Sequence, residues 1–536
     1  MNEFNEWYNH VTKAERAIMD SLNEREKRYL FGNSLKFGTA GIRTKMGIGT
    51  NMLNEYTIKR VALGIVNYLK AITSEPKVVI GFDGRHHSPV FATILAEVLT
   101  NHNVKVLATE KPVPTPFLSH VTRKTNATIG IMITASHSPK EYNGIKLYNS
   151  NGSQIATEET FIIKDAIDQV QEVFNIEQKT IPNNFYEVIS DNYYHEYQDY
   201  ILSLTTVPLN NSQLSVVYTP QHGVGNVFME NIFKALQIKY YNVEEQMEVN
   251  GDFPNTVEQN PEKIPAFNKA IEYALNNRAD LIFSHDPDAD RLGVMVKHQE
   301  SYHYITGNQL AAIIFDYLIT KFEKINNAFI VKTVVSSNFI DLIAKAHNVE
   351  VINALTGFKN IATKIDENIN AGKNFIFAYE EAIGYIVDAG IRDKDGFGVA
   401  VICLELANKL KSEGKTLLDK LTELYQQYGY FAEETVVVYD ETLEGAEHIK
   451  EMIEKWRDYN FDTIANLKII NKEDYLNMPG FESSNFIKFN LENNSFVTIR
   501  PSGTEPECKY YFVISGNSKE DAQLRLNNIK EFIFRG

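Results

Sequence analysis

The sequence predicts an α/β protein with three similar mixed α/β domains and a further α+β domain at the C-terminal end. A pattern of strand, polar loop, helix and strand occurs three times at widely separated places. The C-terminal part of the chain arranges its strands and helices differently. A chain of 536 residues is also too long for a single hydrophobic core, so several domains are expected.

Each of the three occurrences starts with a short run rich in β-branched residues and passes through a polar loop into a helical pattern. The expected strand, helix and second strand are 77–83, 90–100 and 104–108; 215–220, 227–236 and 238–243; and 328–333, 339–346 and 349–354. The loops are GRHHSP, QHGVGN and VVSSN. Functional loops should lie at the carboxyl ends of the strands, as in other open α/β sheets. Chance similarity between β-α-β units is the alternative to three related domains.

The C-terminal part predicts an α+β domain of another type. Strands are expected at 433–439, 486–490, 495–500 and 509–515, with helices at 444–459 and 519–534. The polar, charged stretch 412–415 is the expected entry to this domain.

Composition excludes several classes of protein. A hydrophobic content of 43% with 23% charged residues is typical of ordinary globular proteins. The net charge of −16 argues against general affinity for nucleic acid or anionic membranes. Two cysteines, Cys403 and Cys508, provide no disulfide framework and favour a reduced, cytoplasmic setting. The N-terminus lacks the pattern of a secretory signal, and apolar stretches such as 310–319 are too short to span a bilayer.

The segment TASHSPKEYNGIK, residues 134–146, directly follows the apolar run 127–133. Ser136 is therefore either an ordinary turn serine or a hydroxyl held at a strand end for chemistry. A Ser-His-Asp hydrolase would place its nucleophile in a G-x-S-x-G elbow, whereas residues 134–138 read T-A-S-H-S. Consecutive side chains on extended backbone point apart, so His137 is not automatically the base for Ser136.

The stretch SHDPDADR, residues 284–291, follows the expected strand 280–283 and contains three alternating aspartates. On extended backbone, Asp286, Asp288 and Asp290 would point the same way and repel one another unless a cation lay between them. All-oxygen ligation favours Mg²⁺ or Ca²⁺. An EF-hand would need Gly and Glu where Arg291 and Lys297 stand, so that interpretation fails. An exposed acidic turn is the alternative to a metal site.

Three other loops carry chemical groups but are weak signals individually. RPSGTEP, residues 500–506, offers a cation, two hydroxyls and backbone amides, which suit a phosphate but also form common loop compositions. KFGTAGIR, residues 36–43, ends in a possible anion ligand, although many glycine turns end in an arginine. YEEAIGY, residues 379–385, pairs two glutamates that suit sugar hydroxyls or form a solvated turn.

In this order, GTAGIR, TASHSPKEYNGIK, DPDADR, EEAIGY and RPSGTEP resemble the α-D-phosphohexomutase superfamily over essentially the whole chain. The length, the serine loop and the IRDKDG stretch are most similar to its long phosphoglucomutase/phosphopentomutase branch. The resemblance implies three similar mixed α/β domains and a smaller C-terminal domain around a central cleft. The expected domains are 1–190 with the phosphoserine loop, 191–305 with the metal-binding loop, 306–420 with the sugar-binding loops and 421–536 with the phosphate-binding loop.

The resemblance also implies roles for individual residues. Ser136 matches the phosphoserine, and Asp286, Asp288 and Asp290 match the Mg²⁺ loop, with the serine phosphate as a further ligand. The implied substrate-binding positions are Arg291, Thr356, Gly357, Lys359, Glu380, Arg392, Arg500, Ser502, Gly503 and Thr504. The implied catalytic cations are Arg43, Lys146 and Lys394. His137 and Lys146 are candidates for the general base, and His137 is equally a candidate for a structural hydrogen-bond partner.

The implied reaction interconverts α-D-glucose 1-phosphate and glucose 6-phosphate through phospho-Ser136 and a glucose 1,6-bisphosphate intermediate. The resemblance implies one Mg²⁺ per subunit, glucose 1,6-bisphosphate as activator, and a cytoplasmic monomer or homodimer that binds a phosphosugar but neither nucleic acid nor membrane.

The alternatives are a phosphopentomutase, a phosphomannomutase, a glucose 1,6-bisphosphate synthase, a Mg²⁺-dependent sugar phosphatase and a catalytically silent phosphosugar-binding protein. Ala382 stands where many members have a serine and puts the hexose specificity in doubt. Ser138 stands where asparagine is frequent and leaves the nucleophile intact.

Overall fold

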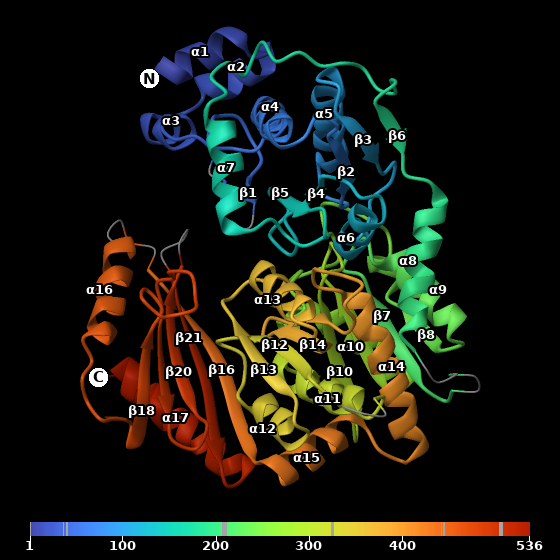
Figure 1. The fold of residues 1–536 in the computed structure, drawn as a ribbon, viewed down its shortest axis with the longest axis vertical. Helices are drawn as coiled ribbons and strands as arrows, with labels where there is room; N and C mark the ends of the chain where they lie inside the picture. Colours follow the sequence, from blue (N-terminus) through green and yellow to red (C-terminus); the bar gives the residue numbers. More distant parts are fainter. Residues whose placement is uncertain are drawn as a thin grey trace. The chain divides into compact units, whose positions relative to one another are not determined.

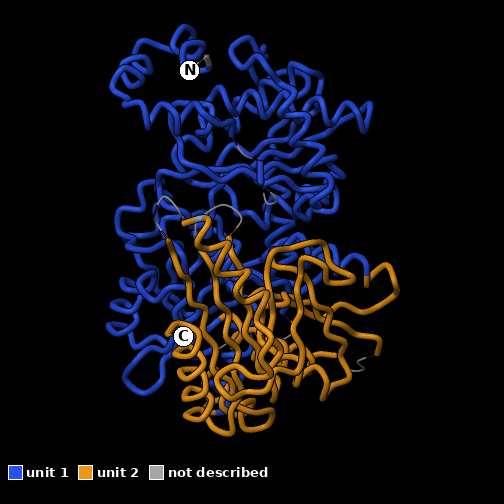
Figure 2. Tube along the Cα trace, turned by 90° about the vertical axis from the view of Figure 1, so that its left-hand side faces the viewer, with its two compact units in different colours: residues 1–306, 357–367, 382–413 blue, residues 307–356, 368–381, 414–536 orange. Residues whose placement is uncertain are grey.

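The structure, a computed structural model, describes residues 2–35, 37–38, 41–205, 209, 212–322, 326–440, 442, 445–502 and 507–535. The chain divides into two compact units (Figure 2). Unit 1 comprises residues 1–306, 357–367 and 382–413, and unit 2 comprises residues 307–356, 368–381 and 414–536. The chain passes between the units several times, so each unit contains segments that are distant in sequence.

The first sheet of unit 1 positions the predicted serine loop. Its strands, in spatial order, are β1 (Ile42–Lys45), β5 (Tyr142–Asn149), β4 (Ile129–Ile133), β2 (Lys77–Phe82), β3 (Lys105–Ala108) and β6 (Tyr186–Val188). β4, β2, β3 and β6 are parallel, whereas β5 is antiparallel to both β4 and β1. Every residue of β4 is buried, which is typical of a parallel strand covered on both faces.

Helices cover both faces of this sheet. They are α4 (Glu55–Ile72), α5 (Ser88–Asn101), α6 (Thr115–Lys124) and α7 (Thr157–Asp168). The chain runs from β2 through α5 to β3 and then back through α6 to β4 (Figure 1). Because right-handed crossovers in opposite directions place their helices on opposite faces, α5 and α6 enclose the central strands. Three short N-terminal helices, α1 (Asn2–His10), α2 (Lys13–Asp20) and α3 (Glu24–Phe31), contribute a separate aromatic cluster that includes Trp7 and Phe31.

The second sheet of unit 1 carries the aspartate loop. Its strands, in spatial order, are β11 (Ser301–Ile305), β10 (Leu292–His298), β9 (Leu281–His285), β7 (Ser215–Thr219) and β8 (Lys239–Asn242). β7 is parallel to β8 and β9, and β10 is antiparallel to β9. The associated helices are α8 (Asp191–Ser203), α9 (Asn226–Ala235) and α10 (Asn268–Asn277), with 3₁₀ turns at Glu244–Gln246 and Ile264–Phe267. The aspartates lie between β9 and β10.

The third group of elements includes three parallel strands of unit 2 in the order β13 (Glu350–Ala354), β12 (Ala328–Thr333) and β14 (Asn374–Glu380). The helices α11 (Gly307–Ile319), α12 (Phe339–Ala346) and α15 (Leu417–Tyr428) belong to the same unit. The strand β15 (Gly384–Ile386) and the buried helix α14 (Gly396–Ser412) belong to unit 1, and α13 (Phe358–Asn370) begins in unit 1 and ends in unit 2.

The C-terminal sheet of unit 2 is antiparallel. Its strands, in spatial order, are β16 (Tyr430–Tyr439), β21 (Glu507–Gly516), β20 (Phe496–Pro501), β19 (Ile487–Leu491), β18 (Leu467–Asp474) and β17 (Thr463–Ile464). The helix α17 (Lys519–Arg535) packs on β16 and β21, and α16 (Gly445–Arg457) packs on β19, β20 and β21. This arrangement is the α+β type that the sequence predicted.

The three predicted β-α-β patterns are confirmed as β2-α5-β3, β7-α9-β8 and β12-α12-β13. The strands β17 and β18 of the C-terminal sheet were not predicted, because β17 has only two residues and polar residues interrupt the pattern of β18. No helix in the described ranges combines the length and the apolarity that a bilayer crossing requires.

Candidate active site

The predicted nucleophile lies in a tight turn between β4 and β5. Ser136 adopts the left-handed backbone conformation, with a φ of 51°, which is uncommon for a residue with a Cβ atom. Its N–H donates to Thr134 Oγ1 at 2.8 Å, and only 2% of the residue is exposed. Ser136 is therefore a fixed part of a buried turn and not an exposed loop hydroxyl.

The hydroxyl of Ser136 contacts a carboxylate, a guanidinium and an imidazole. Its Oγ donates to Asp286 Oδ2 at 2.9 Å. Arg291 Nη1 donates to Ser136 Oγ at 3.2 Å, and His137 Nδ1 also lies 3.2 Å from Ser136 Oγ. The Arg291 guanidinium thus lies where it can pair with a phosphate on Ser136. The Asp286 carboxylate lies where it accepts the hydroxyl proton in a hydrogen bond.

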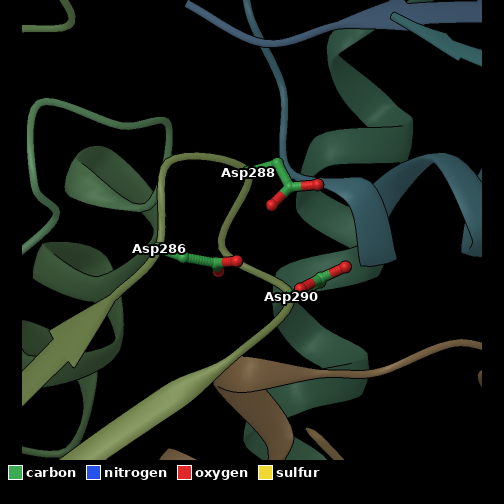
Figure 3. Close-up of side chains that lie close together, drawn as sticks. All are labelled: Asp286, Asp288 and Asp290. Atoms are coloured by element: carbon green, nitrogen blue, oxygen red, sulfur yellow. The ribbon is translucent and has the colours of Figure 1, made fainter. Parts of the chain in front are cut away.

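Asp286, Asp288 and Asp290 converge as predicted, but the predicted reason is wrong. The prediction assumed extended backbone, whereas β9 ends at His285 and the aspartates lie in a turn. Ala289 has a φ of 55° within this turn. The turn directs all three carboxylates to the same side of the loop (Figure 3). One oxygen of each lies within 4.8 Å of the others, and all three side chains are buried.

This donor set fits a hard divalent cation. Within the described residues, Asp288 Oδ1 and Asp290 Oδ1 are buried and receive no hydrogen bond. Buried carboxylate oxygens without a donor are costly unless a cation provides the compensating charge. Three carboxylates favour Mg²⁺ or Ca²⁺. No other group of three or more His, Cys, Asp or Glu side chains in the described ranges is arranged to hold a metal.

Two lysines neutralise part of the negative charge. Lys146 Nζ donates to Asp288 Oδ2 at 2.8 Å and to Asp290 Oδ2 at 3.0 Å, and Lys394 Nζ lies 3.3 Å from Asp290 Oδ2. Burial alone lowers the pKa of a lysine, but Asp288 and Asp290 outweigh burial and raise the pKa of Lys146. A general base would need the opposite shift, so Lys146 is a charged donor in this arrangement.

Two threonines complete the surroundings of Asp288. Thr115 Oγ1 donates to Asp288 Oδ2 at 2.9 Å, and Thr134 Oγ1 donates to it at 3.3 Å. The backbone N–H of Thr115 also donates to the Asp288 carbonyl at 3.0 Å. Together with Lys146, these donors occupy Oδ2 and leave Oδ1 for a cation.

Asp286 differs electrostatically from its two neighbours. Burial, together with the charges of Asp290 and Asp288, raises the pKa of Asp286 well above its ordinary value. Burial also opposes ionisation of Asp288 and Asp290, but the lysines hold their pKa values below normal. A proton on Asp286 must therefore leave before all three carboxylates can bind a divalent cation.

We expect the metal-free protein to lose stability as the pH rises through the raised pKa of Asp286, and Mg²⁺ to restore it. A group whose pKa is raised on folding favours the folded state below its unfolded pKa, about 3.9 for Asp. That contribution disappears as the pH rises through the folded pKa. Asp288 and Asp290, with lowered pKa values, contribute stability above the unfolded pKa that is lost only as the pH falls toward the acid range.

The measurement is Tm against pH, from about pH 5 to 9, with a chelator and with Mg²⁺. Asp286→Asn serves as the control, because it removes the titrating group and should flatten the difference between the two curves. A chelated wild-type protein with the same pH profile as chelated Asp286→Asn would contradict the expectation.

His137 is held as a neutral imidazole. Arg291 Nη1 donates to His137 Nδ1, and because a guanidinium can only donate, this nitrogen is an acceptor. Burial, together with the charges of Arg291 and Arg43, lowers the pKa of His137 well below its ordinary value. His137 is thus unprotonated and close to Ser136, which suits both of its predicted roles, general base and structural hydrogen-bond partner.

Arg43 and Lys359 lie in unit 1 with partners of their own. Arg43 follows the glycine turn, of which Thr39 and Ala40 lie outside the described residues, and its Nη1 donates weakly to Ser138 Oγ at 3.5 Å. Its side chain is otherwise exposed and available to an anion. Lys359 Nζ donates to Thr157 Oγ1 at 2.6 Å.

Arg392 and Lys394, the predicted basic pair, have different surroundings. Arg392 is buried and forms an ion pair with Asp366, with 2.7 Å between Nε and Oδ1. Lys394 reaches the aspartate loop, as described above. The intervening Asp393 is fully buried and accepts a hydrogen bond from Tyr148 at 2.8 Å. The structure therefore associates Lys394, and not Arg392, with the three aspartates of the 286–290 loop.

The predicted sugar-loop residues belong to both units. Glu380 is the last residue of β14 and is largely buried in unit 2. Thr356 is the last residue of a unit 2 segment, and Gly357 begins the next segment of unit 1. Gly357 has a φ of 102°, a conformation that favours glycine, so this turn depends on the residue found there.

The predicted phosphate loop belongs to unit 2. Arg500 lies near the end of β20, and the N–H of Ser502 donates to the Glu507 carbonyl at 2.8 Å. Gly503 and Thr504 lie outside the described residues. The role of this loop therefore stays a prediction.

Sequence reasoning missed Thr115 and Thr134, which donate to Asp288, and Arg85, which donates to carbonyls of the serine turn. The threonines belong to an ordinary helix start and an ordinary strand end, so nothing in their local sequence indicated contact with Asp288. Arg85 had a signal, because it lies in the polar loop GRHHSP at the carboxyl end of a predicted strand.

Comparison with known proteins agrees with this site. Models described as phosphoglucomutase/phosphomannomutase, alpha/beta/alpha domains I, II and III, match residues 34–174, 195–299 and 306–428. A protein named phosphoglucomutase from Staphylococcus aureus (strain MRSA252) is 36% identical over 523 residues, which cover 94% of this chain and 93% of the relative.

Two solved structures share the fold. The open form of pp63/parafusin, a Paramecium phosphoglucomutase, has a TM-score of 0.73 and 18% identity, covering 94% of this chain and 95% of its own. A phosphoglucomutase/phosphomannomutase family protein from Burkholderia thailandensis has a TM-score of 0.71 and 18% identity, covering 93% of this chain and 98% of its own. With three family domains matched along most of its length, the chain belongs to the phosphoglucomutase/phosphomannomutase family of the α-D-phosphohexomutase superfamily.

Proposed function

We propose that the protein is a phosphoglucomutase that interconverts α-D-glucose 1-phosphate and glucose 6-phosphate through phospho-Ser136. The observation that carries the proposal is the Ser136 hydroxyl, 2.9 Å from Asp286 and next to two buried carboxylate oxygens that lack a donor in the described residues. The glucose phosphates are favoured by the name of the Staphylococcus aureus relative, which matches nearly the full chain.

In the proposed reaction, the phosphoryl group moves from Ser136 Oγ to the free hydroxyl of the bound sugar phosphate. This gives glucose 1,6-bisphosphate, which turns over and returns its other phosphate to Ser136. Mg²⁺ held by Asp286, Asp288, Asp290 and the serine phosphate would neutralise charge on the transferring group. Arg291 donates to Ser136 Oγ and provides a fixed positive charge at the oxygen that leaves phosphorus in the first transfer and attacks it in the second.

His137 is the better candidate for the general base. Lys146 is charged and bound to two aspartates, whereas His137 is neutral and 3.2 Å from Ser136 Oγ. A phosphate dianion on Ser136 would offset the charges of Arg291 and Arg43 and raise the pKa of His137 toward the working range. If Arg291 turned to that phosphate, its hydrogen bond to His137 Nδ1 would break, and the freed lone pair would accept the proton of the incoming sugar hydroxyl.

The remaining roles rest on the resemblance. Arg500, Ser502, Gly503 and Thr504 would bind the phosphate that is not being transferred. Thr356, Gly357, Lys359, Glu380 and Arg392 would contact the sugar, and Arg43 and Lys394 would add positive charge near the transferring group. Glucose 1,6-bisphosphate would restore phosphate to Ser136 whenever the intermediate escapes, which makes it the expected activator.

The experiment that tests the function compares glucose, mannose and ribose 1-phosphates at equal concentrations, with Mg²⁺ and a catalytic amount of glucose 1,6-bisphosphate. Glucose 1-phosphate should give the highest kcat/KM and should be converted without release of inorganic phosphate. A preference for mannose or ribose 1-phosphate would make the protein a phosphomannomutase or a phosphopentomutase. Stoichiometric release of inorganic phosphate would identify a phosphatase.

A further inference from the structure

Arg85 is a buried cation that the proposed chemistry does not use. It follows β2 in the sequence FDGR, and only 2% of the residue is exposed. Its Nε lies 3.3 Å from Asp83 Oδ2, and both side chains are fully buried. Asp83 is fixed in turn, because its Oδ1 accepts hydrogen bonds from Ser88 Oγ at 2.9 Å and from the Arg85 N–H at 3.0 Å. Among the residues that the structure describes, Asp83 Oδ2 and Arg85 Nε form no hydrogen bond, so the attraction between these two buried atoms is one of charge alone.

The terminal nitrogens of Arg85 bind the backbone of the serine turn. Nη1 donates to the carbonyls of Pro139 at 3.0 Å and Tyr142 at 3.1 Å. Nη2 donates to the carbonyls of Ser136 and Ser138. One planar guanidinium therefore donates to four carbonyls between β4 and β5. A guanidinium has four terminal N–H groups in a rigid fork, so its donors match these four acceptors in number and direction.

The turn that Arg85 binds contains the strained residue. Ser136 has a φ of 51°, and a left-handed residue with a Cβ atom persists only where its surroundings determine its conformation. Arg85 donates to the carbonyl of Ser136 itself, which restrains the peptide plane that follows the nucleophile. The ring of Phe253 covers the guanidinium, with 5.2 Å between Cζ and the ring centroid. The arginine is thus fixed by an anion, four carbonyls and an aromatic ring.

We propose that Arg85 is a positioning residue for the phosphoserine. By binding the carbonyls of the turn, it holds Ser136 in the left-handed conformation that directs Oγ toward Asp286. Its terminal nitrogens donate to these four carbonyls, so the proposed role acts through the turn and not through contact with a ligand. This inference rests on the proposed function of Ser136 as phosphocarrier. Since a displacement of about 1 Å at a reacting atom can cost about 100-fold in rate, loss of this arrangement should appear in kcat.

The test is Arg85→Lys in the full-length protein loaded with Mg²⁺. A lysine keeps the charge opposite Asp83 but has three donors on one atom and cannot donate to four separate carbonyls. We expect kcat to fall about 100-fold, with KM for glucose 1-phosphate and the Kd for Mg²⁺ within about threefold of wild type. Transfer of phosphate from glucose 1,6-bisphosphate to dephosphorylated Ser136, followed by intact mass, should slow by the same factor as kcat.

Arg60→Lys is the matched control. Arg60 lies in the same domain, is largely buried and donates through Nε to the Ile167 carbonyl at 3.2 Å. Its replacement should lower Tm without changing kcat or the phosphorylation rate. Asp83→Asn is the second test variant, in case Arg85→Lys does not fold. It keeps the size of the side chain but weakens the ion pair, and it should reduce kcat by about tenfold with the same unchanged KM.

The outcomes separate this inference from the proposed function. A wild-type protein that never carries phosphate on Ser136 would overturn both. Phosphorylated wild type together with folded Arg85→Lys, or folded Asp83→Asn, that transfers phosphate at the wild-type rate would overturn only the role of Arg85. A parallel loss of kcat, Mg²⁺ affinity and substrate affinity would mean that Arg85 maintains the fold in general and does not position Ser136.

Discussion

Replacing Ser136 by alanine should abolish mutase activity, with kcat/KM lower by about 10⁴-fold or more, as expected when a covalent nucleophile is removed. The hydroxyl is the group that donates to Asp286 and accepts from Arg291, and alanine offers neither interaction. The variant should also lack covalent phosphate, which peptide mapping of active wild-type protein should place on Ser136. The measurements are a coupled assay with glucose 1-phosphate and the intact mass before and after incubation with glucose 1,6-bisphosphate.

The fold should survive this change. Alanine is as strained as serine in the left-handed conformation, so the backbone cost is unchanged. Ser203→Ala is a suitable control, because Ser203 is exposed at the end of α8 and its hydroxyl donates to the Tyr200 carbonyl at 2.7 Å. This control should keep both activity and phosphate. Substantial activity in Ser136→Ala, or phosphate mapped to another residue of active enzyme, would refute the phosphoserine role.

Asp288→Asn should weaken Mg²⁺ binding by about 100-fold or more. Removing a group that only supports a metal ligand already lowers metal affinity by about 10–100-fold, and Asp288 is expected to be a ligand itself. The Oδ2 atom of Asp288 accepts hydrogen bonds from Lys146, Thr115 and Thr134. The carbonyl oxygen of an asparagine would take that position, because all three groups are donors. The amide nitrogen would then point toward the other two carboxylates, where it repels a cation. Calorimetric titration with Mg²⁺ measures the affinity, and steady-state kinetics measure the accompanying loss of kcat.

Asp252→Asn makes the same chemical change at a different place. Asp252 is about half exposed and forms its ion pairs with Lys140 and His86, at 3.2 Å in each case. Exposed pairs of this kind contribute little, so the control should bind Mg²⁺ like wild type. If Asp288→Asn bound Mg²⁺ as tightly as Asp252→Asn, the aspartate loop would not be the metal site.

The sequence by itself determined which residues could carry the chemistry. Ser136 follows an apolar run that is typical of a buried strand. The three aspartates are so close in sequence that their carboxylates would repel one another unless a cation lay between them. The order of five short motifs then indicated the family. These conclusions depend on local spacing and residue type, which are fully present in the chain. The repeated β-α-β pattern is also local, and it predicted the helices α5, α9 and α12 closely.

Only the tertiary structure decided how those residues are held. The aspartates converge through a left-handed turn at Ala289, although the spacing suggested extended backbone. Lys146, a candidate base by sequence, is a charged donor, because β5 brings it to Asp288 across a gap of many residues. Arg85 donates to the serine turn from the loop that follows β2, a different strand of the same sheet. Contacts of this kind depend on which strands become neighbours and on the charge each buried group meets there, and neither is determined by the residues next to it in the sequence.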